Sequence, residues 1–575
     1  MNISFTSNNW YLRECDKKIV EELSRSLSIT KTTARVLANR GISDPENAFK
    51  YLNPNLSDIP DPFTLPDMKI AVGRIALALN KDERIGIFGD YDVDGVTATA
   101  LLASFLSSLG HKPYVLLPDR LERGYGLNCD AIDKFKGQGV GLIITVDNGI
   151  RATEAVARAR EFGMDVIVTD HHMPEDKLPK AFALVDPKLM KDENGLEDLS
   201  GCGVAFMLAL ALRRHLRDAG ALKGQEPNLK EELDIVALGT IADIMPLTGT
   251  NRIFTAFGLL EIARAQRLGI RALMSVSGTA LGSISPGMVA FRLAPRINAA
   301  GRIGTAYRAL DLLLTDDEGK AFAIALELDK ANRKRQSLEE KALSQAHSML
   351  KSAPGIMDGI VVHGDDWHVG IIGIVAAKLA EIYERPAVVI TRSTNPPRGS
   401  ARTGGNIDLL KALAPCSDIL LQYGGHTQAA GLSIEASNIP VFEKSFSQAC
   451  KELGDGTTLR HLKIDSYVKP SEIAPELMDE LERCAPFGIG NPEPVLAFES
   501  VQIVDMKTVG NGHVKLRVLS GGISFDAIGF NMADKFQGAS SNMSIAFTPQ
   551  YNTWNGRTTI QLKVRDILMR DRRET

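Results

Sequence analysis

Three aspartates at alternate positions, Asp90, Asp92 and Asp94, follow a short apolar run near the start of the chain. On an extended chain, side chains two residues apart point the same way, so these carboxylates would repel one another unless a cation lay among them. A hard divalent metal ion suits such a group of oxygens. Gly95 then allows a turn into a helical pattern over residues 96–103. Because a lone motif of this kind is more often a helix-capping turn, a metal site needs further ligands.

Further acidic and imidazole side chains follow other apolar runs. Residues 141–146 lead to Asp147, residues 165–169 lead to Asp170, His171 and His172, and residues 235–242 lead to Asp243. Because ligands in open α/β sheets gather at the carboxyl ends of the strands, we expect these groups on one rim of one sheet. Oxygen and nitrogen ligands without any cysteine predict Mn²⁺ or Mg²⁺ and argue against a structural zinc ion.

The elements that must position these ligands alternate along the chain. Strand patterns near residues 84, 112, 141 and 165 are separated by helical patterns near residues 96, 130 and 151. This alternation predicts a parallel sheet covered by helices. Residues 316–350 contain no proline and no glycine after Gly319, and their Ala, Leu, Glu and Lys content predicts a long helix.

A second, smaller α/β unit is predicted over residues 355–455, with strands at 359–363 and 387–391. The run Arg398-Gly399-Ser400-Ala401-Arg402 would place two guanidiniums and a hydroxyl in a turn. Gly424-Gly425-His426 offers backbone N–H groups that can approach a phosphate closely. An ordinary turn followed by a helix explains both strings equally well.

From about residue 460 the pattern changes to alternating strands with one helix at 471–484, which predicts a small OB-like β-barrel. Cations and aromatic residues are interleaved along it, as single strands require for backbone contact and base stacking. The candidates are Lys507, Lys515, Arg517, Tyr551, Trp554 and Arg557. Aromatic residues of a small barrel more often belong to its core.

Composition limits the class of protein. The 575 residues are too many for one core, and 44% hydrophobic with 24% charged residues is ordinary for a soluble globular protein. The six cysteines show no CxxC spacing, and no segment has the pattern of a signal peptide or membrane span, so we expect a cytoplasmic protein with no membrane partner. The net charge of −4 means that nucleic acid would bind to local basic patches.

The strings GDYDVDG, VDNGI, TDHH and ADIMPL resemble, in order, the four motifs of the DHH phosphoesterase superfamily. Three further strings, PDRLERGYG at 118–126, RLAPRINAAGR at 292–302 and GGH at 424–426, resemble the RecJ family of bacterial single-strand-specific exonucleases. The resemblance covers nearly the whole chain. It implies an α/β fold with a parallel-sheet DHH domain, a long connecting helix, a smaller α/β DHH-associated domain and a C-terminal OB-like β-barrel.

We therefore expect five segments along the chain. They are an N-terminal extension (1–70) that clasps the first domain, a DHH catalytic domain (71–310), a connecting helix (311–352), a DHH-associated substrate-binding domain (353–458) and an OB-like nucleic-acid-binding domain (459–575).

The resemblance also implies roles for individual residues. Two divalent ions, Mn²⁺ or Mg²⁺, would be held by Asp92, Asp94, Asp147, His171 and Asp243, with Asp147 bridging both ions and Asp170 orienting an imidazole. His172 would contact the substrate phosphate. The substrate-binding residues implied by the family are Arg120, Asn298, Arg302, Ser400, Arg402, Gly424, Gly425 and His426.

One position departs from the family pattern. Many members carry a histidine four residues before the middle aspartate, where this chain has Phe88. Phenylalanine cannot bind a metal ion. The first site must use Asp90 or water in its place, or be weak, and we favour Asp90.

The family implies a single-stranded-DNA-specific 5′→3′ exonuclease that releases 5′-mononucleotides in DNA repair and recombination. It also implies a monomer that works with a single-strand-binding protein and a RecQ-type helicase. The residues alone indicate only metal-dependent hydrolysis of a phosphoester. Two alternatives are a DHH phosphodiesterase acting on short oligonucleotides and a catalytically inactive replisome or repair scaffold. The barrel argues against the first, and the full set of repelling carboxylates argues against the second.

Overall fold

The computed structural model describes residues 10–118, 126–191, 195–222, 224, 226–352, 358–454, 461–510, 512–536, 543–554 and 556–569. The chain divides into two compact units, each assembled from separate stretches. Unit 1 lies within Met1–Ile59, Pro246–Ala256 and Leu459–Thr575, and unit 2 within Pro60–Met245 and Phe257–Thr458. Within the described residues, no helix is both long and apolar enough to cross a lipid bilayer.

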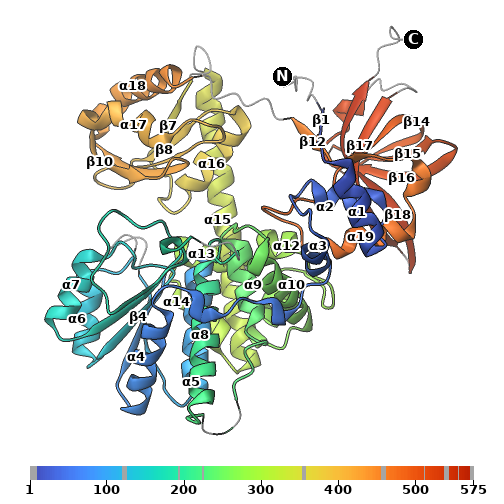
Figure 1. The fold of residues 1–575 in the computed structure, drawn as a ribbon. Helices are drawn as coiled ribbons and strands as arrows, with labels where there is room; N and C mark the ends of the chain where they lie inside the picture. The colour runs from blue at the N-terminus through green and yellow to red at the C-terminus, as the bar shows by residue number, and fades with distance from the viewer. Residues whose placement is uncertain are drawn as a thin grey trace. The chain divides into compact units, whose positions relative to one another are not determined.

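Unit 2 contains a five-stranded parallel sheet in the order β3-β2-β4-β5-β6. Its strands are β2 (Ile85–Phe88), β3 (Tyr114–Leu116), β4 (Leu142–Val146), β5 (Asp165–Thr169) and β6 (Ala183–Val185). Every residue of β2 and β4 is buried, because helices cover both faces of the sheet. Helices α4 (Met68–Asn80), α5 (Val93–Ser108) and α8 (Gly201–Asp218) lie on one side, and α6 (Cys129–Gly137) and α7 (Thr153–Glu161) on the other (Figure 1).

A helical region follows this sheet in the chain. It comprises α9 (Leu233–Ala242), α10 (Gly249–Arg264), α11 (Leu268–Val276), α12 (Pro286–Met288), the π-helix η4 (Val289–Leu293), α13 (Ala294–Ile303) and α14 (Tyr307–Leu314). The first residues of α10 belong to unit 1. The predicted long helix is present as α15 (Glu318–Ser352), which is 35 residues long.

A second sheet in unit 2 has the order β10-β11-β9-β8-β7. Its strands are β7 (Ile360–Gly364), β8 (Ala387–Thr391), β9 (Arg398–Arg402), β10 (Leu420–Gly425) and β11 (Ala429–Ile434). Apolar residues of α15 and α16 (Ile372–Tyr383) pack on one face, and those of α17 (Leu409–Leu413) and α18 (Ile439–Glu452) on the other. The prediction of a turn at 398–402 is wrong, because β8 and β11 bond this segment on both sides as a central strand.

Unit 1 is built on a β-barrel. Its strands are β14 (Leu496–Val509), β15 (His513–Ser520), β16 (Ile523–Gly529), β17 (Met543–Trp554) and β18 (Arg557–Met569). They pair in the order β14-β15-β16-β18-β17, and β17 returns to pair with β14 and closes the barrel. Two short strands, β12 (Leu462–Ile464) and β13 (Ser466–Tyr467), and helix α19 (Pro475–Arg483) precede it. The fold class predicted from the sequence is confirmed.

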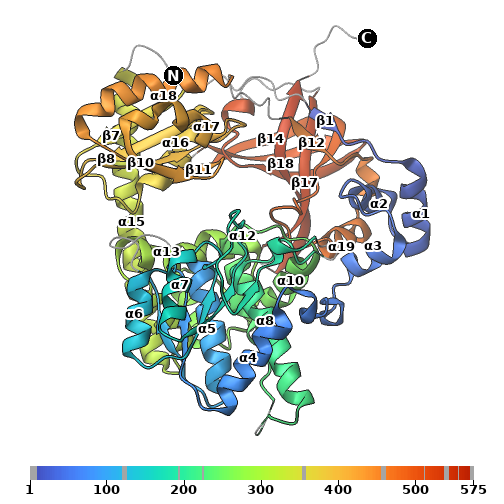
Figure 2. The ribbon, with the colours of Figure 1, turned by 60° about the vertical axis from the view of Figure 1, so that its left-hand side comes forward.

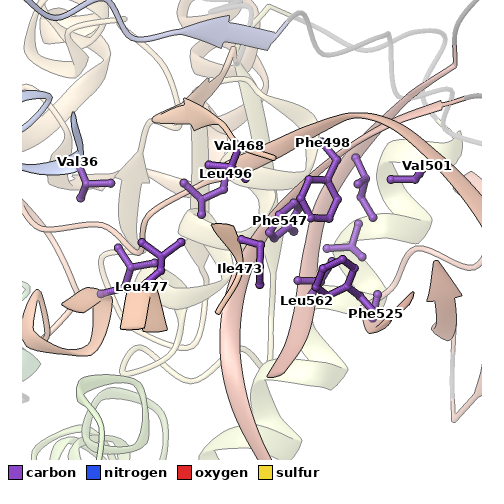
Figure 3. Packing of buried hydrophobic residues seen from close by; sticks show 14 of the residues in the cluster. Val36, Val468, Ile473, Leu477, Leu496, Phe498, Val501, Phe525, Phe547 and Leu562 are labelled. Carbon is purple, nitrogen blue, oxygen red and sulfur yellow. The ribbon is translucent and has the colours of Figure 1, made fainter. Parts of the chain in front are cut away.

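The N-terminal helices α1 (Lys17–Leu27), α2 (Lys31–Ala38) and α3 (Pro45–Leu52) belong to unit 1, and β1 (Trp10–Leu12) pairs with β12. In both views α1, α2 and α19 lie beside the barrel strands (Figure 1 and Figure 2). Leu23 and Val36 share one core with Leu477 and Phe498, and Figure 3 shows part of this core. The prediction that this extension clasps the first domain is therefore wrong for these helices, whose apolar faces are buried against α19 and the barrel, whereas residues 60–70 belong to unit 2.

Arg252, at the start of α10, joins three segments of unit 1. Its guanidinium donates to the carbonyl oxygens of Tyr51, Arg483 and Cys484, at 2.9, 3.0 and 2.9 Å. It also lies 3.9 Å from the centre of the Tyr51 ring. These carbonyls belong to the ends of α3 and α19, where a helix has unsatisfied acceptors and favours a cation.

Candidate active site

We predicted that the three aspartates after β2 lie on an extended chain, and this prediction is wrong. Asp92 caps α5, its Oδ1 accepting a hydrogen bond from the N–H of Gly95 at 3.0 Å, and Asp94 lies in the first turn of the helix. A Cβ at Gly95 would lie 2.5 Å from the Cβ of Asp90, so only glycine allows this close reversal. A tight turn, and not strand alternation, therefore carries the carboxylates to the edge of the sheet.

The start of α8 holds two carboxylates in place. The backbone N–H groups of Gly201 and Cys202 donate to the two oxygens of Asp94, at 2.6 and 3.1 Å. A Cβ at Gly201 would lie 2.5 Å from the Cβ of Asp147. Asp147 follows β4 and has a φ of +63°, a conformation that costs free energy in a residue other than glycine. A helix start with no side chain at its first residue thus brings the two acids together.

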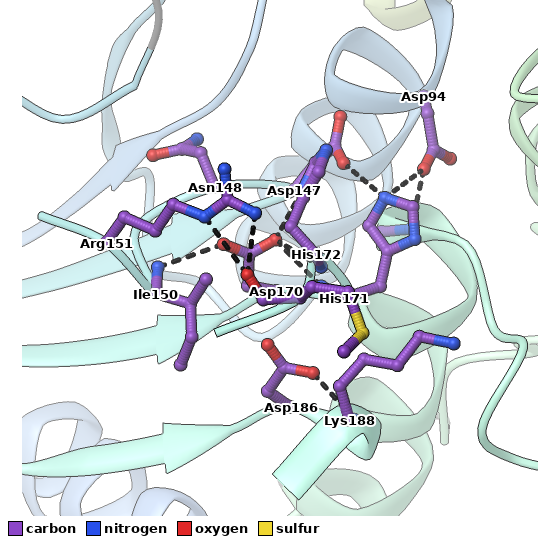
Figure 4. A network of polar contacts seen from close by, with 12 residues as sticks. Asp94, Asp147, Asn148, Ile150, Arg151, Asp170, His171, His172, Asp186 and Lys188 are labelled. Carbon is purple, nitrogen blue, oxygen red and sulfur yellow. Dashed lines mark hydrogen bonds and ion pairs between the residues drawn. The ribbon is translucent and has the colours of Figure 1, made fainter. Parts of the chain in front are cut away.

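Asp170 follows β5 and organises the two histidines (Figure 4). Its Oδ1 accepts hydrogen bonds from the backbone N–H groups of His171 and His172, at 2.7 and 3.2 Å, and lies 2.7 Å from Nδ1 of His172. Its Oδ2 accepts from the N–H of Ile150 at 2.9 Å. Both oxygens are occupied within the protein, so Asp170 orients its neighbours.

The remaining predicted ligands gather around His171, which is 7% exposed. Its Nε2 lies 3.0 Å from Asp147 Oδ1, 3.7 Å from Asp243 Oδ2 and 3.8 Å from Asp94 Oδ2. Among the described residues, three groups of side chains have ligand atoms that lie within 4.8 Å of one another: Asp90, Asp92 and Asp147; Asp94, His171 and Asp243; and Asp147, His171 and His172. The predicted set of ligands is therefore brought together at one rim.

The electrostatics of these groups favour a cation. Burial, followed by the charge of Asp92, raises the pKa of Asp94 to about 7. Burial, followed by the charges of Asp94 and Asp92, raises the pKa of Asp243 to about 8, and the pKa of Asp147 is raised well above its usual value for similar reasons. Burial and the charge of His172 lower the pKa of His171 to about 3, which leaves a neutral imidazole able to bind a metal ion. The donor set thus fits divalent cations.

The pKa of His172 is shifted in the opposite direction to that of His171. Burial disfavours its charged form, but the hydrogen bond and the charge of Asp170 outweigh burial and raise the pKa of His172 to about 9. Near neutral pH its ring is therefore a cation, and Nε2–H is a donor suited to an anion.

A cavity of about 230 Å³ opens beside these groups. It is lined by Tyr91, Asp92, Val93, Asp94, Ala242, Asp243, Asn298 and Arg302. Asn298 and Arg302, predicted to contact phosphate, thus share a cavity with three predicted metal ligands. Arg302 also donates from Nη1 to the carbonyl of Gly370 at 3.2 Å.

The predicted phosphate-binding residues of the second sheet lie on neighbouring strands. Gly431 of β11 is paired with Ser400 on one side and Gly424 on the other. The hydroxyl of Ser400 accepts a hydrogen bond from Arg402 Nη1 at 3.0 Å. At the start of α16, a Cβ at Gly373 would lie 3.1 Å from both Ser400 Oγ and Arg402 Nη2. A helix N-terminus, a hydroxyl and a guanidinium therefore meet, which suits a phosphate.

His426 lies next to the first sheet. Its Nε2 is 3.2 Å from Nη2 of Arg151, whose guanidinium also donates to the carbonyl of Met173, just after the two histidines. Gly425 has a φ of +150°, and a Cβ there would lie 2.3 Å from the carbonyl of Ala429. Arg120, the remaining predicted substrate residue, lies outside the described residues.

Phe88 is 2% exposed and packs in the core beneath the sheet with Ile132 and Phe135. The Phe88 side chain therefore supplies no ligand to the metal groups. Asp90, by contrast, belongs to one of the three groups and is 1% exposed.

In the barrel, Lys507 of β14 is paired with Lys515 of β15 and both are exposed. Two like charges opposite one another destabilise a sheet unless an anion binds there. Arg517 forms an ion pair with Asp526 at 3.4 Å, and the Tyr551 hydroxyl donates to Asp479 at 2.8 Å. The side chain of Trp554 lies outside the described part of the structure.

Sequence reasoning missed four residues that shape the site: Tyr91, Arg151, Gly201 and Gly373. The small residues in Ser200-Gly201-Cys202-Gly203 were the available signal for a close approach to Asp147. Nothing local in the sequence distinguishes Gly373 or Arg151, because their partners lie on distant segments.

Comparison with known proteins agrees with this architecture. Residues 84–240 match the DHH family, N-terminal domain, residues 357–452 match the DHHA1 domain and residues 464–566 match the RecJ OB domain.

The single-stranded-DNA-specific exonuclease RecJ of Bacillus subtilis (strain 168) is 36% identical over 564 residues, which cover 97% of this chain and 70% of that protein. The protein of the same name from Escherichia coli (strain K12) is 34% identical over 522 residues, covering 88% of this chain and 90% of that protein.

Among solved structures, RecJ from Thermus thermophilus in complex with Mn²⁺ superposes with a TM-score of 0.84 at 30% identity, covering 98% of this chain and 80% of that one. The same protein in complex with Mg²⁺ gives a TM-score of 0.77 at 29% identity, covering 98% and 79% of the two chains. On these similarities the chain belongs to the RecJ family of single-stranded-DNA-specific exonucleases.

Proposed function

We propose that this protein degrades single-stranded DNA from the 5′ end, releasing 5′-mononucleotides by hydrolysis that depends on two divalent metal ions, Mn²⁺ or Mg²⁺. The observation that carries the proposal is the set of three Asp and His groups around one rim, beside a cavity that also contains Arg302. Relatives that are named single-stranded-DNA-specific exonucleases, and a relative solved with Mn²⁺ and with Mg²⁺, support it.

The residues divide between two metal sites. Asp90, Asp92 and Asp147 would hold one ion, and Asp94, His171 and Asp243 the other, with Asp147 next to both groups. Asp90 would replace, as a metal ligand, the histidine that many family members carry at the position of Phe88. When bound, two such ions lower the pKa of a water molecule and neutralise charge on the scissile phosphate.

The other side chains would bind and orient the phosphate. His172, kept protonated by Asp170, can donate a hydrogen bond from Nε2 to a phosphate oxygen. Arg302 and Asn298 line the same cavity as Asp92 and Asp94, so they would hold the phosphate against the metal ions.

The second phosphate site supports the proposed direction. Ser400, Arg402 and the start of α16 would bind a 5′-terminal phosphate, and the nucleotide between this site and the metal ions would be the one removed. The paired lysines of the barrel, Lys507 and Lys515, would contact phosphates of the single strand. The family resemblance supports a role in DNA repair and recombination, with a single-strand-binding protein and a RecQ-type helicase as partners.

The direct test uses one single strand carrying a label at either its 5′ or its 3′ end, incubated with Mn²⁺ or Mg²⁺. We expect the 5′ label to be released first, as a mononucleotide, and chelator to prevent the release. First release of the 3′ label would reverse the polarity, and internal cleavage would contradict an exonuclease.

The terminal phosphate pocket is tested by comparing strands with a 5′ phosphate and a 5′ hydroxyl. The bidentate pair that Arg402 can make with phosphate predicts faster degradation of phosphorylated strands by about tenfold or more at low concentration. Arg402→Ala should remove this preference. Gly373→Ala, which places a methyl group 3.1 Å from Arg402 Nη2, should reduce it. Lys411→Ala, on an exposed part of α17, is the matched control and should keep the preference. An unchanged preference in Arg402→Ala would place the pocket elsewhere.

A further inference from the structure

Ile244 has an unusual backbone at the end of α9. The N–H of Ile244 bonds to the carbonyl of Ile241 and the N–H of Met245 to the carbonyl of Thr240, both at 3.2 Å. This pair of bonds is the helix-ending arrangement in which the residue after the cap is usually glycine. Ile244 adopts the required left-handed conformation with a φ of +61°.

The choice of isoleucine there is costly for the fold. The other non-glycine residues of the described chain with a positive φ are Ser28, Asp67, Asp82, Asp147, Ala265, Glu384 and Asn531, and none of them is β-branched. A β-branched residue is the type least compatible with this conformation. The side chain of Ile244 is 67% exposed, so core packing does not offset the strain.

The neighbours of Ile244 in the chain indicate a functional reason for this backbone strain. Asp243, the preceding residue, lies 3.7 Å from His171, and Ala242 and Asp243 line the cavity that contains Arg302. A phosphodiester held in that cavity carries a nucleoside on each side. The charged and polar groups of the cavity suit the phosphate, whereas the exposed apolar side chain of Ile244, the residue that follows Asp243 in the chain, suits the face of a base or sugar.

We propose that Ile244 contacts one of the two nucleosides that flank the scissile phosphate, and that its strained backbone presents the side chain for this contact. This inference rests on the proposed nuclease function. Strain retained at a site of binding is a recognised way in which a protein trades stability for function.

The first test compares Ile244→Gly with Glu384→Gly. Glu384 is an exposed residue with a φ of +52° that ends α16, so both substitutions relieve the same kind of strain. Both variants should therefore resist urea at least as well as the wild type. Only Ile244→Gly should lose hydrolysis of single strands, by about fivefold or more at subsaturating DNA. Equal activity of Ile244→Gly and wild type would overturn the proposal.

The second test removes the base and not the side chain. Strands with an abasic residue at the terminal or the second position are degraded alongside the intact strand, in Mn²⁺. At one of these positions the wild type and Glu384→Gly should degrade the abasic strand about fivefold more slowly than the intact strand. Ile244→Gly, which has already lost the contact, should degrade the two strands at equal rates. An abasic penalty in Ile244→Gly as large as in the wild type at both positions would overturn the contact. Failure of the wild type to degrade intact strands would instead contradict the proposed function.

Discussion

Asp147 lies between His171 and the first residue of α8, and it is the side chain next to both metal groups. Asp147→Asn keeps the size of the side chain and removes its charge. We expect the rate of single-turnover hydrolysis to fall by about a thousandfold or more, because both metal ions lose a charged ligand. Calorimetric titration with Mn²⁺ should show weaker binding. Without metal the variant should be at least as stable as the wild type, since one of several repelling acids is gone.

The matched control for this substitution is Asp165→Asn. Asp165 lies at the opposite end of β5, where it forms an ion pair with Arg74. It should affect stability alone and leave Mn²⁺ binding unchanged. Full activity of a folded Asp147→Asn protein would contradict the two-metal assignment.

Asp170 acts through the protonation of His172. In Asp170→Asn the charge that raises the pKa of His172 is removed, while burial, which lowers it, stays. We expect the pKa of His172 to fall below that of the wild type, measurable by NMR titration of the ring. Activity near neutral pH should drop by about 10- to 100-fold, as for other partners of active-site histidines, and should partly recover as the pH is lowered. Parallel pH profiles for variant and wild type would exclude this role.

The residues of the active site show how much could be predicted from the sequence. The types and order of the acidic and histidine residues predicted the metal ligands, because few packing arguments explain three carboxylates in five residues. The geometry at Asp92 and Asp94 could not be read from alternation. It depends on how closely Gly95 approaches Asp90, which only the folded backbone determines.

Among the secondary-structure elements, those with continuous apolar runs were predictable and those with small residues were not. β2, β4 and β5 are apolar because helices bury them on both faces. β9 contains arginine, glycine, serine and alanine, and becomes a strand because β8 and β11 bond to it. Tertiary pairing there overrides local propensity.

The ends of helices α3 and α19 depend on Arg252, which is 3% exposed. Lysine keeps the charge but cannot donate to three separate carbonyls in the same plane. Arg252→Lys should therefore destabilise unit 1 by about 2–4 kcal/mol, through lost hydrogen bonds to buried acceptors. Urea unfolding of the full chain, followed by the fluorescence of Trp10 after Trp367 and Trp554 have been replaced by phenylalanine in both proteins, would measure this loss. Arg264→Lys, on an exposed part of the same helix, should change the free energy of unfolding by less than about 0.5 kcal/mol.

For the whole molecule, the crowded acids link stability to pH and to metal. In the folded state the pKa values of Asp94 and Asp243 are raised to about 7 and about 8, above those of an unfolded chain. The stabilisation from their protonated forms is complete below the unfolded pKa and is lost as the pH rises through the folded values. The raised pKa of His172, about 9, has the same sign.

The metal-free protein should therefore lose stability between about pH 4 and about pH 9, and Mn²⁺ should restore most of the loss. The urea midpoint, measured in chelator and in excess Mn²⁺ across this range, tests the expectation. Asp243→Asn should flatten the dependence in chelator. A midpoint in chelator that rises with pH would show that these acids are not crowded in the folded state.

The assembly of unit 1 was the part of the molecule least accessible from sequence. The amphipathic patterns of α1 and α2 show that an apolar face exists, but not which surface covers it. The partners lie in α19 and the barrel, as the bond from the N–H of Thr30 to Glu480, 450 residues later, illustrates.

This separation has a consequence for synthesis of the protein. At translation rates of about 5–20 residues per second, the first helices emerge roughly 20–90 s before the segment that buries them. During that interval Leu23 and Val36 have no core to enter, whereas the parallel sheet of unit 2 can already form from contiguous chain. Newly made chains should therefore pass through a stage in which unit 2 is folded and the N-terminal helices are exposed to chaperones and proteases. Cleavage near residues 17–38 in ribosome-bound chains, and its disappearance after release, would reveal that stage.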